Sequence, residues 1–292
     1  MKIAILGGMS NDTGAQTDYI TPFKENFPNA EFSEIRFDYL VFEVTQSTFE
    51  VYDWRTKTPL SKYDYLIFRG KIRSNTECAY VVSRYAIHKG IQFFNDYSNY
   101  RPSSKLAQAV TFFELNIPML PTYYSLNDEY LADITSQKLE FPLIVKDSFG
   151  SHGNNNFVAK TDEQLRQIVA DNATVKFVTQ GFCPNDCDYR ILVIGDGKPL
   201  IIKRMAAEGT HLNNTSQGGT AELKAELPEQ VIADAKKISK ELKMTIAGVD
   251  ALQNKDTGEY FFLEVNSQPQ LVTGAFVPEK LELLKQFFAT QQ

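Results

Sequence analysis

The chain has 292 residues, a formal net charge of −6, 43% hydrophobic residues and 23% charged residues. This length allows a large core and two or three lobes, and the composition is ordinary for a soluble globular protein. The negative charge argues against broad nucleic-acid binding, and three cysteines do not make a disulfide framework. The N-terminus lacks a signal-peptide pattern and no apolar run reaches membrane-spanning length, so we expect a cytoplasmic protein outside membranes.

The first hundred residues have the pattern of an α/β layer. Apolar runs at 2–6, 63–68 and 91–94 predict strands, and residues 78–88 predict a helix. Arg69 follows the second of these strands, and in open α/β sheets ligands gather beyond the carboxyl ends of the strands. Arg69 is therefore a candidate for binding a substrate carboxylate, although a surface arginine explains its position equally well.

A helix is predicted from a cap at Ser103 or Ser104 to about Leu115, with Lys105 in its first turn. A cation at that end opposes the helix dipole, so helix stability does not explain this lysine. Residues 141–146 then predict a strand that ends in Lys146, followed by a loop of small residues at 147–156 and a returning strand at 157–159. Such a loop can fold its backbone N–H groups over a polyphosphate, but it is not a P-loop and glycine-rich turns are common in hairpins.

The remaining chain alternates predicted strands and helices. Strands are predicted at 176–179, 188–194 and 199–204, and helices from near Pro228 and over 279–289. Between them, residues 206–221 form a long polar stretch, and a loop of that length in a compact domain is more often functional than accidental.

A β-hairpin is predicted from residues 247–252 and 260–266 around the turn cluster 254–258. Side chains two apart on a strand share a face, so Glu264 and Asn266 point the same way and Asp250 can reach them from the partner strand. Two carboxylates and an amide oxygen suit Mg²⁺ bound together with substrate phosphates. The plainer interpretation is a hairpin with solvated acids, but Glu264 lies in strongly apolar sequence.

The order of these motifs resembles the ATP-grasp superfamily, and within it the RimK-like ATP-dependent carboxylate–amine ligases. The resemblance runs from about Ser103 to Leu271. It is carried by the segments 142–146, 187–190, 202–204, 207–209, 218–221, 247–250 and 263–266, together with the loop at 147–156 and Asn214. Before residue 103 the likeness is only that of a general α/β layer.

The resemblance implies an α/β (α+β) chain with an ATP-grasp fold and three parts. These are a pre-ATP-grasp layer at 1–102, a lid and central lobe at 103–182, and a C-terminal metal- and substrate-binding lobe at 183–292, with ATP between the last two. The residues implied to bind ATP are Lys105, Lys146, Gly150, Ser151, Gly153, Gln180, Gly181, Phe182, Asp188, Asn213 and Asn214. Asp250, Glu264 and Asn266 match the family's metal ligands, which hold Mg²⁺ or Mn²⁺, with two ions sharing Glu264.

The implied reaction activates a carboxylate as an acyl phosphate, which an amine then attacks to form an amide. Arg190 and Arg204 match catalytic residues near the transferred phosphate, and Arg204 with Arg69 is implied to bind substrate. The implied substrates are an amino acid such as glutamate and an amine on a small molecule, peptide or protein, and related enzymes often form homo-oligomers. The alternatives are an ATP-grasp kinase that makes no amide and a nucleotide-binding protein without turnover.

Two positions depart from the family pattern. Gly181 stands where the hinge usually has a glutamate, so that a side-chain contact is lost while backbone contacts remain. After Asn266 the family commonly continues with Ser-Pro-Gly, whereas this chain has Gln268-Pro269-Gln270. That turn lies near the acceptor, so the sequence leaves the acceptor unidentified.

Overall fold

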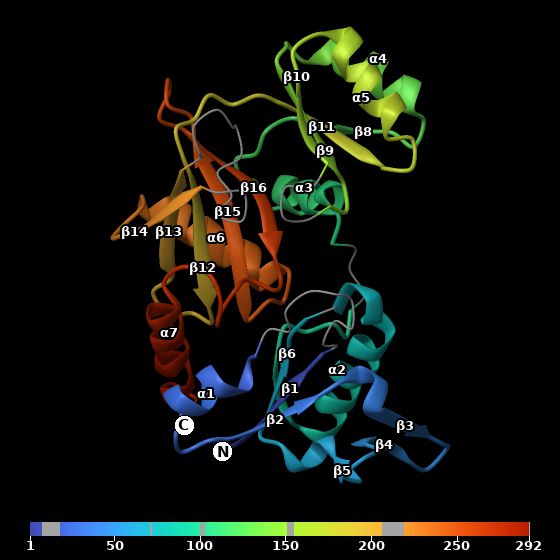
Figure 1. Ribbon diagram of the computed structural model, residues 1–292, viewed down its shortest axis with the longest axis vertical. Coiled ribbons are helices and arrows are strands. Elements are labelled where there is room, and N and C mark those ends of the chain that lie inside the picture. The colour runs from blue at the N-terminus through green and yellow to red at the C-terminus, as the bar shows by residue number, and fades with distance from the viewer. Residues whose placement is uncertain (8–17, 71, 100–102, 151–154, 206–218, 292) are drawn as a thin grey trace.

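The computed structural model describes all residues except 8–17, 71, 100–102, 151–154, 206–218 and 292. In the described part, strands and helices form three sheet-containing regions with a small additional sheet near the N-terminus (Figure 1). The α/β fold class is therefore confirmed. None of the described helices has both the length and the apolar character needed to cross a membrane.

The N-terminal sheet is parallel, in the order β2-β1-β6-β7. Its strands are β1 (Lys2–Leu6), β2 (Glu31–Ile35), β6 (Tyr65–Phe68) and β7 (Gln92–Phe94). Alternate residues of β1 enter different clusters: Ile3 and Ile5 join one core, and Ala4 and Leu6 join another. The sheet is buried on both faces, which explains why its strands read as continuous apolar runs.

Helices and short elements cover this sheet. The predicted helix is α2 (Thr76–Lys89), while α1 (Ile20–Asn26) had no clear sequence signal. A small antiparallel sheet of β3 (Leu40–Val44), β4 (Phe49–Asp53) and β5 (Thr58–Pro59) is added at one side. Short 3-10 turns lie at Phe37–Tyr39, Leu60–Lys62 and Ile72–Asn75.

The middle sheet is antiparallel, in the order β10-β9-β11-β8. Its strands are β8 (Thr122–Tyr124), β9 (Leu143–Asp147), β10 (Asn156–Ala159) and β11 (Phe177–Gly181). The helices α4 (Asp128–Lys138) and α5 (Asp162–Asp171) lie together on one side of it (Figure 1). On the other side, α3 (Lys105–Glu114) starts at the predicted cap, where the Ser104 hydroxyl accepts a hydrogen bond from the N–H of Ala107 at 3.2 Å.

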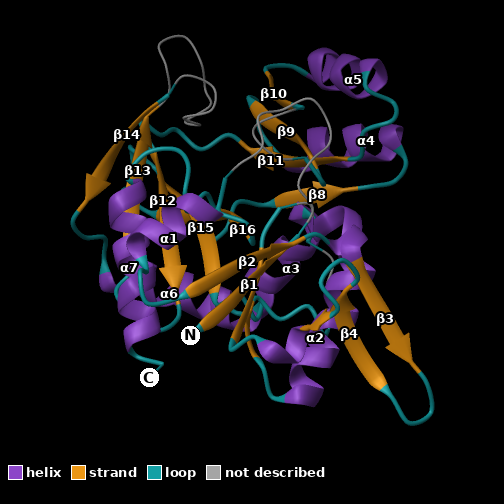
Figure 2. Cartoon of the chain, turned by 60° about the horizontal axis from the view of Figure 1, so that its bottom comes forward, coloured by secondary structure: helices purple, strands orange, loops and turns teal. Residues whose placement is uncertain are grey.

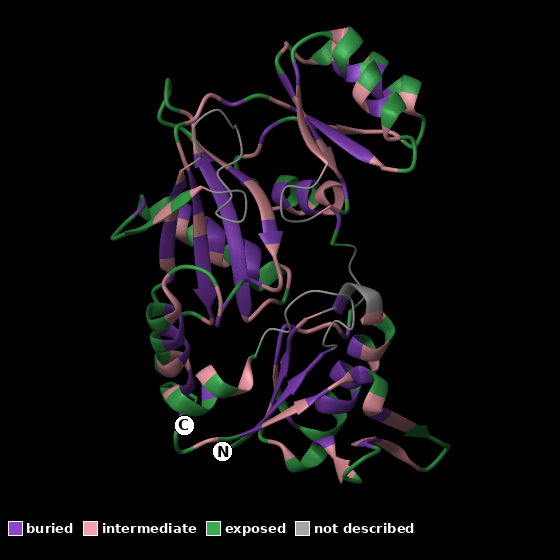
Figure 3. Ribbon diagram, viewed as in Figure 1, coloured by how far each residue is buried: buried purple, intermediate pink, exposed green. Residues whose placement is uncertain are grey.

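The C-terminal sheet has the order β14-β13-β12-β15-β16 and is antiparallel throughout. Its strands are β12 (Asp188–Ile194), β13 (Leu200–Met205), β14 (Thr220–Lys224), β15 (Ile246–Gln253) and β16 (Tyr260–Asn266). The last two form the predicted hairpin, whose turn includes Gly258 at φ +78°. Figure 3 shows β12 and β15 as largely buried strands, and α6 (Glu229–Glu241) packs on them.

The terminal helix α7 (Val277–Ala289) joins the N-terminal and C-terminal sheets. The ring of Phe288 contacts the rings of Phe27, Tyr65 and Phe94, and the same core includes Leu192 and Ile194 of β12. Both ends of the chain consequently lie near α7 and α1, as Figures 1 and 2 show from two directions.

A second contact between the N-terminal and C-terminal sheets consists of hydrogen bonds. The buried Asn95, at φ +64°, follows β7 and uses its amide to bind the backbone of the C-terminal lobe. Its Nδ2 donates to the carbonyls of Ile246 at 3.0 Å and Ser267 at 2.8 Å, while its Oδ1 accepts from the N–H of Ile246 at 2.9 Å. The N-terminal sheet is thus fixed against the strand that carries Asp250.

Candidate active site

Two lysines meet at the junction of the middle sheet, α3 and β16. Lys105 extends from the first turn of α3, and its Nζ donates to the carbonyls of Asp147 at 3.0 Å and Gly150 at 2.8 Å. The same Nζ lies 3.6 Å from a carboxylate oxygen of Glu264 on β16. The backbone of α3 is held here too, because the N–H of Lys105 donates to the carbonyl of Ser148 at 2.9 Å.

Lys146 lies on β9, where its Nζ donates to the side-chain oxygen of Gln180 at 3.0 Å. Burial lowers the pKa of Lys146, and the nearby Glu264 carboxylate acts in the opposite direction. No carboxylate of the described chain lies within ion-pair distance of this ammonium. A desolvated cation without a direct acidic partner is costly, which favours a site that an anion occupies.

The face of β16 alternates as the sequence predicts. Val265 is buried in the C-terminal core, while Glu264 and Asn266 lie on the opposite face. Glu264 has 36% of its side chain exposed, and the Oδ1 of Asn266 accepts a hydrogen bond from the N–H of Gln268 at 2.9 Å. Both residues retain oxygen lone pairs that can face a metal ion.

Asp250 stands opposite Glu264 in the hairpin, but its carboxylate is engaged by arginines. Arg190 binds it with two N–H groups at 2.8 and 2.6 Å, and an Nη of Arg204 lies 3.1 Å from it. Burial acts to raise the pKa of Asp250, but the two guanidinium groups hold it below its ordinary value. The carboxylate is therefore ionised and surrounded by cations.

Asp188 completes this network from the start of β12. Its carboxylate accepts a hydrogen bond from the Nε of Arg204 at 2.6 Å, and both side chains are buried. Burial raises the pKa of Asp188 to about 6, and the Arg204 charge opposes that shift. The network places both predicted catalytic arginines side by side, with planar forks that match carboxylate and phosphate oxygens. A contact of Asp188 with a ribose stays a prediction.

The donor set can be compared with what a magnesium ion requires. Glu264 and Asn266 offer hard oxygen ligands on one face, whereas both oxygens of Asp250 face guanidinium groups. Across the residues that the structure describes, no group of three or more His, Cys, Asp or Glu side chains is placed to hold a metal. A metal at Glu264 and Asn266 would therefore need further oxygens from a ligand, as Mg²⁺ commonly takes from phosphates.

The predicted hinge lies at the end of β11. The side chain of Gln180 is hydrogen-bonded within the chain at both ends of its amide, because besides accepting from Lys146 it donates to the Oγ1 of Thr122 at 2.7 Å. A Cβ built on Gly181 meets nothing within 4 Å, so the space for the missing hinge side chain is open. Phe182 is 38% exposed, while its N–H donates to the carbonyl of Pro142 at 3.3 Å. An exposed aromatic ring at a strand end is a suitable surface for a planar base.

Arg69 is buried, with 3% of its surface exposed, and does not point to open solvent. Its guanidinium donates to the carbonyl of Pro269 in the turn after β16, and its Nε is buried without a hydrogen-bond partner. Burial lowers its pKa. The interpretation as a surface arginine is therefore wrong, and Arg69 instead joins the N-terminal lobe to the predicted acceptor turn.

Four predicted site residues, Ser151, Gly153, Asn213 and Asn214, lie outside the described residues. Gly150 is described, and a Cβ at this position would lie 2.8 Å from the Cβ of Asp147. Glycine is therefore required by the tight turn after β9, independently of any ligand.

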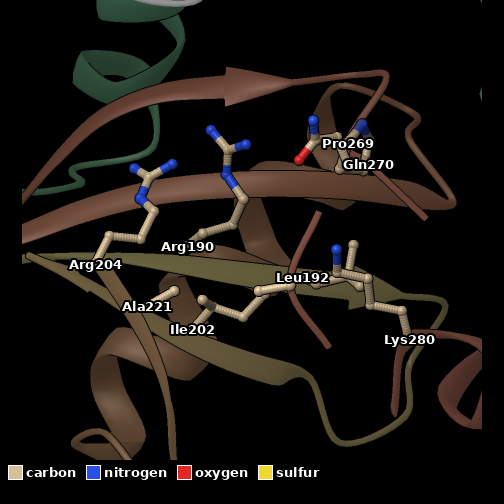
Figure 4. A pocket seen from close by; sticks show the side chains of 9 residues that line it. Arg190, Leu192, Ile202, Arg204, Ala221, Pro269, Gln270 and Lys280 are labelled. Atoms are coloured by element: carbon tan, nitrogen blue, oxygen red, sulfur yellow. The ribbon is translucent and has the colours of Figure 1, made fainter. Parts of the chain in front are cut away.

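A pocket of about 440 Å³, including the part open to solvent, lies beside the arginine network (Figure 4). Its cationic side chains are Arg190, Arg204 and Lys280, and Pro269 and Gln270 of the departing turn also line it. Lys280 of α7 was not predicted as a site residue, since the sequence there reads only as an amphipathic helix. A lysine among the apolar residues of that helix is the signal that could have indicated it.

Curated relatives match about half of the chain. A probable alpha-L-glutamate ligase from Chromohalobacter salexigens is 30% identical over 161 residues, covering 54% of this chain and 52% of the relative. One of the same name from Xanthomonas euvesicatoria is 31% identical over 159 residues, covering 53% of each chain. The chain thus matches about half the length of these relatives.

Solved structures with the same fold cover nearly the whole chain. The ATP-grasp ligase PsnB, in complex with a minimal precursor, has a TM-score of 0.71 at 12% identity and covers 99% of both chains. A RimK domain ATP-grasp protein from Sphaerobacter thermophilus has a TM-score of 0.65 at 14% identity, covering 98% of this chain and 99% of its own. The ATP-grasp fold is therefore confirmed.

The family assignment follows from a direct match. The model of the RimK-like ATP-grasp domain covers residues 106–280, which contain α3 except its first residue, the middle sheet and the C-terminal sheet with the arginine network. This is more than half of the chain, which therefore belongs to the RimK-like ATP-grasp family.

Proposed function

We propose that this chain is an ATP-dependent carboxylate–amine ligase that forms an amide bond through an acyl phosphate. The observation that carries the proposal is the convergence of Lys105, Lys146 and Glu264, with Lys105 only 3.6 Å from the Glu264 carboxylate. Two cations and a hard carboxylate suit a polyphosphate with its divalent ion. The curated relatives carry the name of glutamate ligases, which supports ligation over phosphorylation alone.

The proposal assigns binding roles by position. Lys105 and Lys146 would hold phosphate oxygens, and the exposed ring of Phe182 with the backbone of Gln180 and Gly181 would receive the base. Glu264 and Asn266 would bind Mg²⁺ or Mn²⁺ together with the phosphates. We propose two ions in each site. ATP would supply the phosphoryl group that activates the carboxylate as an acyl phosphate. ATP would thus lie between residues 103–182 and residues 183–292.

Chemistry in this site requires positioning and charge neutralisation more than a protein nucleophile. Arg190 and Arg204 are hydrogen-bonded to Asp250 and Asp188 and line the pocket, so their remaining N–H groups are available to a ligand there. They would neutralise the carboxylate as it attacks the γ-phosphorus, releasing ADP. An amine would then attack the acyl carbon, forming the C–N bond and expelling inorganic phosphate. The carboxylate substrate would be an amino acid such as glutamate, and the acceptor an amine on a small molecule, peptide or protein.

The test is a screen for phosphate release with ATP, Mg²⁺, single amino acids and amino acid–peptide pairs, with the products identified by mass. We expect phosphate release that depends on both a carboxylate and an amine, with a product lighter by one water than the sum of the two substrates. A phosphorylated product formed without an amine would show that the chain is a kinase instead. ATP binding without turnover across the screen would contradict the ligase proposal.

A further inference from the structure

Lys280 is a buried cation outside the phosphate-binding lysines. It lies in the first turn of α7 and is 4% exposed, between helix residues that belong to the core. Among the described residues its Nζ has one hydrogen-bond partner, the carbonyl of Thr273 at 3.0 Å, and no carboxylate within ion-pair distance. An ammonium group has three N–H donors, so two remain for a ligand.

The position is unfavourable for a lysine in two ways. Burial of a cation without an acidic partner costs free energy, and a positive charge at a helix N-terminus opposes the helix dipole. Burial accordingly lowers the pKa of Lys280 to about 8, with the nearby Arg190 charge acting in the same direction and the Glu279 charge opposing them. Neither folding nor helix stability explains the residue, which favours a role in ligand binding.

The charges in the pocket differ in how they are compensated. Arg190 and Arg204 are paired with Asp250 and Asp188, so that the four side chains nearly neutralise one another. Lys280 adds a positive charge that no described acid contacts, and the neighbouring Glu279 charge offsets only part of the shift that burial causes in its pKa. In Figure 4, Arg204, Arg190 and Lys280 follow one another along the pocket, so the cation without a contacting carboxylate lies at the end away from Arg204.

We propose that Lys280 binds a second, non-reacting carboxylate of the substrate whose other carboxylate is activated beside Arg190 and Arg204. Lys280 is then a specificity-determining residue that selects dicarboxylates over monocarboxylates of the same shape. This inference rests on the proposed ligase function. The second carboxylate belongs either to a free amino dicarboxylate or to an acidic residue that ends a peptide, and the same subsite chemistry serves both.

The pocket lining supports this division of roles. Gln270 and Pro269 lie at the pocket on the turn where this chain departs from the family's Ser-Pro-Gly. Lys280 is anchored to the carbonyl of Thr273, a few residues further along the same segment. The turn and the start of α7 therefore form one continuous segment from 268 to 280, and this segment can set substrate preference without altering Lys105, Lys146 or Glu264.

The test compares the full-length wild type with Lys280→Met, Lys280→Arg and the control Lys285→Met. Lys285 lies on the same helix, has 39% of its side chain exposed and pairs with Glu282 at 3.8 Å. One arm measures phosphate release with glutamate against glutamine, and the other with Ala-Glu against Ala-Gln. We expect the wild type and Lys285→Met to prefer the acidic substrate of one arm by about tenfold or more in kcat/KM. This is the factor that the loss of one hydrogen bond to a charged group produces.

Lys280→Met should lose that preference through a higher KM for the acidic substrate, and Lys280→Arg should retain most of it because it keeps the charge. The arm in which the preference is seen identifies the source of the carboxylate. A wild type without preference in either arm, or a Lys280→Met enzyme that keeps it, would overturn the inference.

A binding measurement separates this inference from the ligase proposal. Glutarate, a dicarboxylate without an amine, is titrated calorimetrically into wild type and Lys280→Met in the absence of ATP. We expect at least about tenfold weaker binding to the variant. Equal affinities, including absence of binding to both, would overturn the role of Lys280 whether or not turnover is found. If glutarate binds the variant more weakly but no turnover is found, the role of Lys280 in binding a carboxylate is supported and only the ligase proposal is contradicted.

Discussion

Gln108 provides the sharpest test of how the active site is held together. It lies on α3, is 5% exposed, and reaches the outer edge of β16, the last strand of its sheet. Its Oε1 accepts from the N–H of Val265 at 2.7 Å, and its Nε2 donates to the carbonyl of Val265 at 3.1 Å. One side chain thus substitutes for the neighbouring strand that an edge residue lacks.

Gln108→Leu keeps the approximate size but removes both hydrogen bonds to Val265, together with the one that Nε2 donates to the carbonyl of Ser103 at 3.2 Å. Each buried backbone group left without a partner costs about 1–3 kcal/mol, so we expect a loss of about 3 kcal/mol in the free energy of unfolding. The edge of β16 should also loosen relative to α3. Because α3 carries Lys105 and β16 carries Glu264, we expect weaker ATP binding as well.

The assay is urea unfolding followed by circular dichroism, together with calorimetric titration of ATP and Mg²⁺. The matched control is Gln167→Leu, since Gln167 forms an exposed hydrogen bond to Asp171 at 2.6 Å and its loss should cost less than about 0.5 kcal/mol. If Gln108→Leu loses no more stability than this control, the edge of β16 does not depend on Gln108, and the reasoning fails.

Three further predictions concern the site and its supports. Glu264→Gln should lower phosphate release by about a hundredfold or more with an unchanged circular dichroism spectrum, and near-normal turnover would remove Glu264 from the metal site. Gly7→Ala would place a Cβ 1.5 Å from the Arg69 carbonyl oxygen and should cost about 3 kcal/mol or more, whereas Gly181→Ala meets nothing within 4 Å and should change stability by less than about 0.5 kcal/mol. Equal melting temperatures for these two variants would contradict that contrast. Because the pKa of Lys280 falls from 10.5 to about 8 on folding, the folded chain binds fewer protons between these values, so its stability should rise with pH there by about 3 kcal/mol relative to Lys280→Met. Parallel stability–pH curves from urea unfolding would disprove this.

Local patterns predicted most of the elements around the site. The hairpin of β15 and β16 followed from alternation and its turn cluster, and Val265 is buried opposite Glu264 as the period of two requires. The Ser104 cap of α3 was also readable, because a cap depends on residues within one turn. These features are local, so neighbouring residues were sufficient to predict them.

The pairing of charges could not be read from the sequence. Asp250 was predicted as a metal ligand, but its two oxygens are bound by Arg190 and Arg204, which come from two other strands. That contact depends on the strand order β13-β12-β15, which no local pattern specifies. Arg69 was ambiguous for the same reason, since its partner Pro269 lies 200 residues away.

Weakly patterned segments were missed as well. The strands of the small N-terminal sheet are short and partly exposed, so they lack a continuous apolar run. Strand β14 is almost fully exposed and begins inside a stretch that reads as a loop. Its place at the sheet edge, paired only with β13, explains why its residues need no apolar face.

The terminal helix has a consequence for how such a chain can be altered. The same thirteen residues of α7 supply Phe288 to the packing between the N-terminal and C-terminal sheets and Lys280 to the pocket. Trimming the chain from its C-terminal end would remove an anchor of the core together with a lining of the pocket. If α7 were replaced by a helix from another protein, the replacement would have to keep the aromatic residues of the C-terminal half, because they pack in the core. Only the first turn could then be changed to alter substrate preference.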